Sequence, residues 1–187
     1  MEIVTKFIFG KEVPPSNVAA FIKKSVNSYK KMLIEEGSIA PYYDERRVKV
    51  IYNSNGLLTL SCKEVLSYGQ IHPQTTTKFK CFDLSQSKQM ELYDLFQDNF
   101  STELLKIAEE QFYMQLALDK TKSLKEQDFR FTDNKFRLND NFYINTDGLH
   151  FYYNNYEIRA YGYGPTDLVI PWSKIEHLLK ENIKKSI

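Results

Sequence analysis

The sequence of 187 residues lacks most of the features that mark particular classes of function. It has two cysteines, three histidines and one tryptophan, and 25 basic residues face 24 acidic ones, so the net charge is +1. A general electrostatic nucleic-acid binder needs a basic surplus or stripe, so no nucleic-acid partner is expected. No stretch approaches the ~20 consecutive apolar residues that a membrane-spanning helix needs.

Motifs for metals, cofactors and nucleophilic catalysis are also missing. His72, His150 and His177 lie far apart and form no HxxxH pair, and the two cysteines lack CxxC spacing. There is no G-x-S-x-G elbow, and residues 162–164 lack the spacing of a phosphate-binding loop. We therefore expect no metal, no cofactor and no catalytic residue of a known motif.

Aromatic residues are what the chain has in quantity. Its 13 Phe, 13 Tyr and 42% hydrophobic content predict a folded chain rather than a disordered one. The length predicts a single domain over residues 1–187. The alternative is a division into two subdomains, 1–118 and 129–187.

Hydrophobic periodicity and turn residues divide the chain into short elements. The patterns predict strands over 3–9, 48–53, 58–66, 75–84, 142–145, 149–153 and 167–170, and helices over 16–36, from Ser101 to about Leu116, and from Pro171 onward. Ser173 with Glu176 fits a capping box for that last helix. Because hairpins alternate with helices and no βαβ unit is seen, we expect an α+β fold. It would be an antiparallel sheet built of hairpins, packed against two long helices plus a C-terminal helix.

The loop between the second and third strands sets the register of their pairing. If that hairpin is symmetric about residues 71 and 72, Cys62 lies opposite Cys81, with the two Cα atoms within about 7 Å. Two packed thiols are the preferred interpretation. A cross-strand disulfide is the alternative, and it would imply an oxidising compartment.

Two loops hold the candidate functional residues. The first, residues 68–73, places His72 beside glycine and proline in a connection between strands, either as a hydrogen-bonded loop histidine or as a general base. The second, residues 152–165, is rich in tyrosine and glycine. Its tyrosines suit core filling, a protein-contact surface or a sugar-stacking platform, and the sequence leaves these three open.

Several segments of the chain follow one another in an order and with a spacing that are moderately specific for one family pattern. They are Asn17–Glu36, Tyr68–Pro73, Phe82–Leu84, Leu92–Phe96, Phe142–Tyr153, Tyr156–Ile158, Tyr161, Gly164–Pro165 and Val169–Pro171. Together they resemble a bacterial envelope family that includes the extracytoplasmic domain of lysozyme-sensing anti-sigma factors and the non-catalytic domain preceding some peptidoglycan deacetylases. The chain departs from the family pattern at Gln70, at Pro73 and at residues 159–160.

The resemblance implies a non-catalytic cell-envelope binding or sensing module that recognises a lysozyme-like protein or peptidoglycan. The binding residues implied are Tyr68, His72, Tyr156, Arg159, Tyr161 and Tyr163. An extracytoplasmic location, with the leader absent from this chain, follows from the same resemblance, and a cytoplasmic location is the alternative. The alternative function is a hydrolase of envelope polysaccharide or peptide with His72 as general base.

Overall fold

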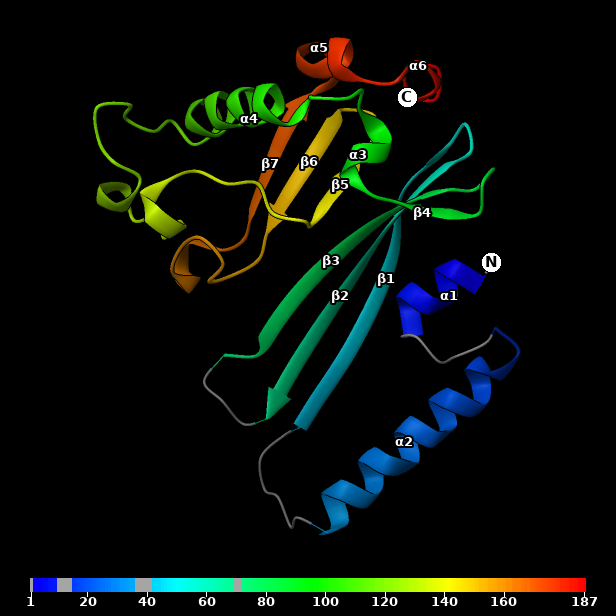
Figure 1. Ribbon diagram of the computed structural model, residues 1–187. Coiled ribbons are helices and arrows are strands. Elements are labelled where there is room, and N and C mark those ends of the chain that lie inside the picture. The colour runs from blue at the N-terminus through cyan, green and yellow to red at the C-terminus, as the bar shows by residue number, and fades with distance from the viewer. Residues whose placement is uncertain (1, 10–14, 36–41, 69–71) are drawn as a thin grey trace.

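Two antiparallel sheets form the framework of the protein (Figure 1). The structure is a computed structural model that describes residues 2–9, 15–35, 42–68 and 72–187. The strands of the larger sheet, in spatial order, are β1 (Tyr42–Ser54), β2 (Leu57–Tyr68), β3 (Gln74–Asp83) and β4 (Lys88–Met90). The smaller sheet consists of β5 (Phe142–Ile144), β6 (Gly148–Tyr153) and β7 (Thr166–Pro171).

Helices flank both sheets. They are α1 (Glu2–Phe9), α2 (Val18–Glu35), α3 (Leu92–Leu95), α4 (Ser101–Gln115), α5 (Trp172–Ile175) and α6 (Glu181–Lys184). Short 3₁₀ turns cover residues 15–17, 125–127, 132–134, 161–163 and 176–178. The predicted α+β class is therefore confirmed. Among the described helices, none is long and apolar enough to cross a membrane.

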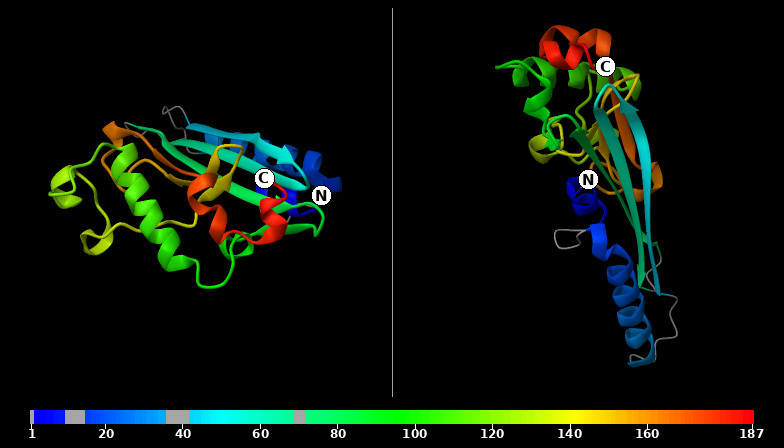
Figure 2. Two further views of the ribbon diagram at one scale, coloured as in Figure 1. Left: turned by 90° about the horizontal axis from the view of Figure 1, so that it is seen from above. Right: turned by 90° about the vertical axis from the view of Figure 1, so that its right-hand side faces the viewer.

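The main core lies between α4, the smaller sheet and the neighbouring face of the larger sheet. Leu104, Ala108 and Phe112 on α4 are buried, as the helical pattern predicts, because α4 packs against β7. The helix α2 lies alongside the long strands, at the opposite end of the molecule from α4, α5 and α6 (Figures 1 and 2). Its apolar side chains Ile22 and Val26 are 48% and 46% exposed, so the core does not enclose them.

The strand predicted over residues 3–9 is wrong, because this segment forms the helix α1. The ring of Phe7 packs edge-on against Phe82 of β3, with centroids 6.2 Å apart. The Arg46 guanidinium donates a 2.7 Å hydrogen bond to the carbonyl oxygen of Ile8. A helix satisfies its own backbone groups while it places Phe7 over a sheet face, so the apolar run needs no strand partner.

The hairpin turn predicted at residues 54–56 is confirmed. Asn55 and Gly56 have φ values of +48° and +80°, the left-handed conformations that a tight hairpin turn requires. The adjoining strands pair along almost their whole length, with one bulge between Val50 and Tyr52. The hairpin of β5 and β6 also forms where residues 146–148 predict it.

The register predicted for the second hairpin is wrong by three residues. Cys62 lies opposite Lys78, and Cys81 lies opposite Thr59. Because an odd shift moves a side chain to the other face of a sheet, the two cysteines lie on opposite faces. Both cysteines are free and buried, so the preferred interpretation of two packed thiols, rather than a disulfide, is confirmed.

The single C-terminal helix predicted from Pro171 is also wrong. The chain forms α5, a 3₁₀ turn that follows it directly, and α6, with the extended residues 179–180 before α6, and Ser173 does not cap a helix. The break occurs because Leu179 forms a β-bridge with Phe96 and the amide of Lys180 donates to the carbonyl of Leu95 at 3.0 Å. Pairing with the chain after α3 therefore interrupts the helix at residues 179–180.

We expect both thiols to react slowly with Ellman's reagent in the folded protein at pH 8. Burial raises the pKa of Cys81 to about 11, against the opposing hydrogen bonds from Thr59 and Ile144, and burial also raises the pKa of Cys62. Both thiols thus stay protonated at pH 8, and the thiolate is the reactive form. In urea without reductant both should react at once; failure to detect two thiols there would contradict the assigned register.

Candidate functional site

The two sheets are joined by two asparagine side chains at the outer edge of β3. The amide of Asn141 accepts a 2.9 Å hydrogen bond from the Phe79 N–H and donates to the Thr77 carbonyl at 2.9 Å. Asn154 accepts from the Thr77 N–H at 2.7 Å and donates to the same carbonyl at 3.2 Å. We call this pair the amide clamp. It satisfies backbone groups that the short strand β4 does not reach.

Aromatic packing reinforces the amide clamp. The ring of Phe79 stacks on Tyr143 with centroids 4.2 Å apart and contacts Tyr152 at 5.2 Å. The Thr59 hydroxyl, fully buried, donates to the carbonyl of Ile144 at 2.9 Å. These contacts fix β5 and β6 against one face of the larger sheet, and thereby fix the loop that follows β6.

That loop begins with a strained turn at residues 154–157. Tyr156 has a φ of +66°, which is uncommon for a residue with a Cβ atom. Glu157 holds the turn, because its carboxylate accepts from the Asn154 N–H at 2.7 Å and from the Asn139 amide at 2.6 Å. As a result the Tyr156 side chain is 60% exposed, whereas Tyr153, three residues earlier, is buried.

Arg159 anchors the middle of the loop. Its guanidinium lies between two rings, 4.1 Å from the centroid of Phe129 and 4.3 Å from that of Tyr163. The Tyr163 hydroxyl donates to the Asp128 carboxylate at 2.7 Å, and this bond raises the pKa of that tyrosine. Arg159 and Tyr163, both predicted to bind a partner, therefore also hold the loop in place through cation–π contacts.

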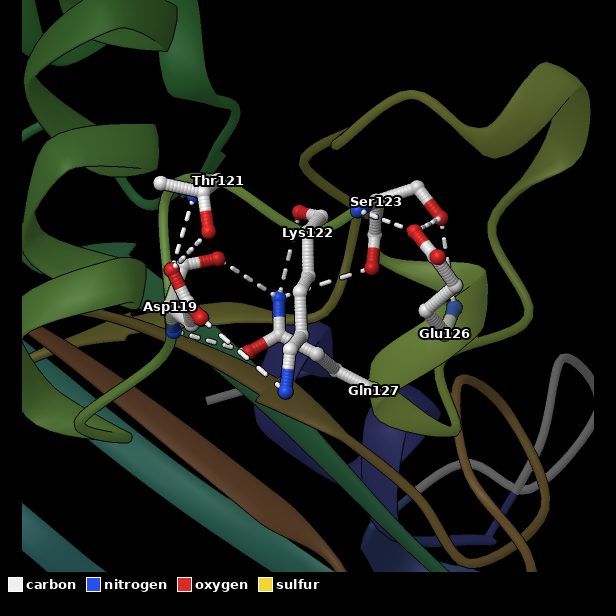
Figure 3. Close-up of polar contacts among 6 residues, drawn as sticks. All are labelled: Asp119, Thr121, Lys122, Ser123, Glu126 and Gln127. Carbon is white, nitrogen blue, oxygen red and sulfur yellow. Dashed lines mark hydrogen bonds and ion pairs between the residues drawn. The ribbon is translucent and has the colours of Figure 1, made fainter.

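The segment that carries Asp128 and Phe129 is ordered by its own polar contacts (Figure 3). The Gln127 carboxamide accepts from the Asp119 N–H at 2.8 Å and donates to the carbonyl of Asp119 at 3.0 Å. Thr121 donates twice to the Asp119 carboxylate, and Ser123 donates twice to Glu126. These bonds lower the pKa of both carboxyl groups. A polar loop with little regular structure thus becomes a fixed support for Arg159.

The structure brings together residues from both predicted loops. The imidazole of His72 stacks on the ring of Tyr161, with centroids 4.6 Å apart and planes 15° apart. The ring of Tyr156 lies 5.3 Å from that of Tyr161. We call these three residues the aromatic surface. The side chain of Tyr68, a further predicted site residue, lies outside the described part of the structure.

A shallow groove of 240 Å³ lies next to the aromatic surface. Its lining residues come from β1, β2, the start of β3 and the two loops: Glu45, Arg47, Lys63, Val65, Pro73, Thr75 and Tyr161. The sheet residues share the face to which the amide clamp attaches the smaller sheet. Sequence reasoning missed the groove residues of the sheet, because alternating charged and apolar residues are ordinary for an exposed strand.

A second polar cluster, buried in the smaller sheet, was also missed. His150 is 4% exposed, and its ring stacks on Tyr143 at 4.2 Å. Its Nδ1 faces Asp167 at 3.2 Å and its Nε2 faces the Asn145 Oδ1 at 3.0 Å. The Tyr143 hydroxyl donates to Asp167 at 2.7 Å, and burial, with this bond, raises the pKa of Tyr143.

This cluster does not resemble a catalytic triad. Backbone N–H groups of Asp147 and Gly148 also point at the Asn145 Oδ1, so that atom is an acceptor and His150 Nε2 must donate to it. Both ring nitrogens are thus occupied within the fold, and among the described residues neither nitrogen hydrogen-bonds to a serine or cysteine. The cluster stabilises the smaller sheet. Among the residues that the structure describes, no group of His, Cys, Asp and Glu could hold a metal ion.

The α+β fold with two hairpin-built sheets is shared with known bacterial proteins. Residues 93–173 match the family described as "Protein of unknown function (DUF3298)". A DUF3298 family member from Bacteroides fragilis has a solved structure that is similar to this chain at 24% identity, with a TM-score of 0.79, over 97% of this chain and 77% of that one.

A DUF3298 family protein from Pseudomonas aeruginosa is similar at 18% identity with a TM-score of 0.66, over 84% of this chain and 70% of that one. At these identities the likeness shows the fold alone. No match was found among curated proteins.

Replacing Asn141 with alanine should lower the free energy of unfolding by about 1–3 kcal/mol, because the Phe79 N–H and the Thr77 carbonyl lose a partner at a partly buried position. Urea denaturation followed by circular dichroism measures this. Asn182→Ala is the matched control, since Asn182 is exposed on α6. Equal stability of the two variants would contradict the role of the amide clamp.

Proposed function

We propose that the chain is a non-catalytic binding module of the bacterial cell envelope that recognises peptidoglycan. One observation carries the proposal: His72, Tyr156 and Tyr161, from loops far apart in the sequence, form a single aromatic surface beside an open polar groove. Binding sites for small ligands typically combine apolar walls with a few placed polar groups.

The chemistry of the surface suits a glycan. Sugar rings have apolar faces that pack on aromatic rings and hydroxyl groups that need polar partners. Tyr156 is 60% exposed, and the strained turn at residues 154–157 fixes the position from which it projects. Strained backbone tends to occur at functional sites, which supports a role in binding rather than in core packing.

The envelope location comes from the resemblance to envelope domains, and an extracytoplasmic site of action is part of the proposal. Both similar solved structures are from bacteria. A lysozyme-like protein is the other partner class that the resemblance implies. A flat patch would suit such a protein partner, whereas the groove beside Tyr161 favours the glycan.

The geometry gives no support to hydrolysis with His72 as general base. A general base needs a positioned partner within hydrogen-bond reach. His72 stacks on the ring of Tyr161, and within the described ranges no acidic side chain hydrogen-bonds to the imidazole. An aromatic platform accounts for this arrangement better than a catalytic one.

Replacing Tyr156 with alanine should weaken binding to purified, insoluble peptidoglycan roughly threefold to tenfold, because an aromatic contact contributes about 0.5–1.5 kcal/mol beyond its buried area. Co-sedimentation of the intact chain with peptidoglycan, over a range of concentrations, measures the affinity.

Tyr93→Ala is the matched control, since Tyr93 on α3 is also 60% exposed and belongs to neither loop. It should bind as the unaltered chain does. Absence of binding to peptidoglycan would refute the proposal, and a stoichiometric complex with lysozyme in its place would establish the protein partner instead.

A further inference from the structure

We infer that the groove recognises a carboxylate, so that its ligand is a glycan carrying an acidic group, bound by Arg47 and Lys63. The inference rests on the proposed function, because it assigns a ligand chemistry to the same surface. It concerns residues of β1 and β2, which neither the resemblance nor the aromatic surface includes.

The positive charges in the groove repel each other when no ligand is bound. Arg47 of β1 lies directly opposite Lys63 of β2, and both line the groove. Like charges directly opposite each other on one sheet face repel and destabilise the pairing. An anion placed between the two side chains would remove that repulsion.

The acidic residue of the groove offsets only part of this positive charge. Glu45 pairs with Arg47, which lies two residues along on the same strand face. Among the described residues no acidic side chain pairs with Lys63, so the three charged lining residues leave one positive charge in excess. A ligand with a single carboxylate would balance it.

The remaining lining residues suit a sugar unit attached to that carboxylate. Arg47 is 68% exposed at its side chain, so its guanidinium is accessible for charge-assisted hydrogen bonds to carboxylate oxygens. Thr75 supplies a hydroxyl, while Tyr161, Pro73 and Val65 supply apolar surface. At 240 Å³ the groove is smaller than the ~300 Å³ of the smallest drug-binding pockets, which fits one sugar unit rather than a long oligosaccharide.

Calorimetry with two disaccharides tests the inference. N-acetylglucosaminyl-N-acetylmuramic acid carries a lactyl carboxylate, whereas N,N′-diacetylchitobiose lacks it. We expect the acidic disaccharide to bind at least about tenfold more tightly, because a hydrogen bond to a charged group is lost with the neutral one. Raising the salt concentration should weaken the binding of the acidic disaccharide and leave the binding of the neutral one unchanged. A galacturonate oligomer, in which the carboxylate is part of the sugar, distinguishes a uronic acid from the lactyl group as the preferred source.

Lys63→Gln should lose that tenfold preference, and Lys63→Arg should retain it. Lys49→Gln is the matched control, because Lys49 lies on the same face of β1 but opposite Ser61, outside the groove. All three substitutions are at exposed positions, Lys63 and Lys49, and circular dichroism verifies that each variant is folded.

Equal affinity for the two disaccharides, or equal effects of Lys63→Gln and Lys49→Gln, would overturn the inference. Peptidoglycan binding that still depends on Tyr156 would then leave the proposed function standing. Failure of the chain to bind peptidoglycan and both disaccharides would refute the two together.

Discussion

The amide clamp is the interaction on which the rest of the structure depends. In the residues before Cys81, β3 has an outer edge that β4 does not cover, and two asparagine side chains pair with it at Thr77 and Phe79. Each hydrogen bond contributes about 1 kcal/mol net, but an unpaired group in its place would cost more. Because Asn141 precedes β5 and Asn154 follows β6, the clamp fixes the smaller sheet from both ends of one hairpin.

The candidate site is a consequence of that placement. Once the hairpin is fixed, the loop after β6 lies over the face of the larger sheet, where Tyr161 meets His72. The stacking of Arg159 between Phe129 and Tyr163 then holds the loop, and the contacts of Gln127 with Asp119 order the segment that carries Phe129. The site thus combines a rigid support with an exposed Tyr156, and its groove is lined by the larger sheet and by the two loops.

The elements with strong local signals could be predicted from the sequence, and the pairings between them could not. The turn at Asn55 and Gly56 and the apolar stripe of α4 depend on neighbouring residues alone. The register of β2 and β3 and the break before α6 depend on partners distant in the sequence. For the same reason, the density of tyrosines marks residues 152–163 as a candidate site, but only the fold distinguishes the buried Tyr153 from the exposed Tyr156. Only the fold, too, places Arg47 and Lys63 in one groove with Tyr161.

We propose that the two loops and the exposed sheet face form one binding site. The most direct measurement is a two-dimensional amide NMR titration of the ¹⁵N-labelled chain with a soluble peptidoglycan fragment. We expect the shifted signals to cluster in β1 and β2 around residues 45–47 and 63–65, near His72 and in residues 156–161, while the signals of α3 and α6 stay unchanged. A fragment that shifts no signals, or shifts only signals outside that cluster, would contradict it.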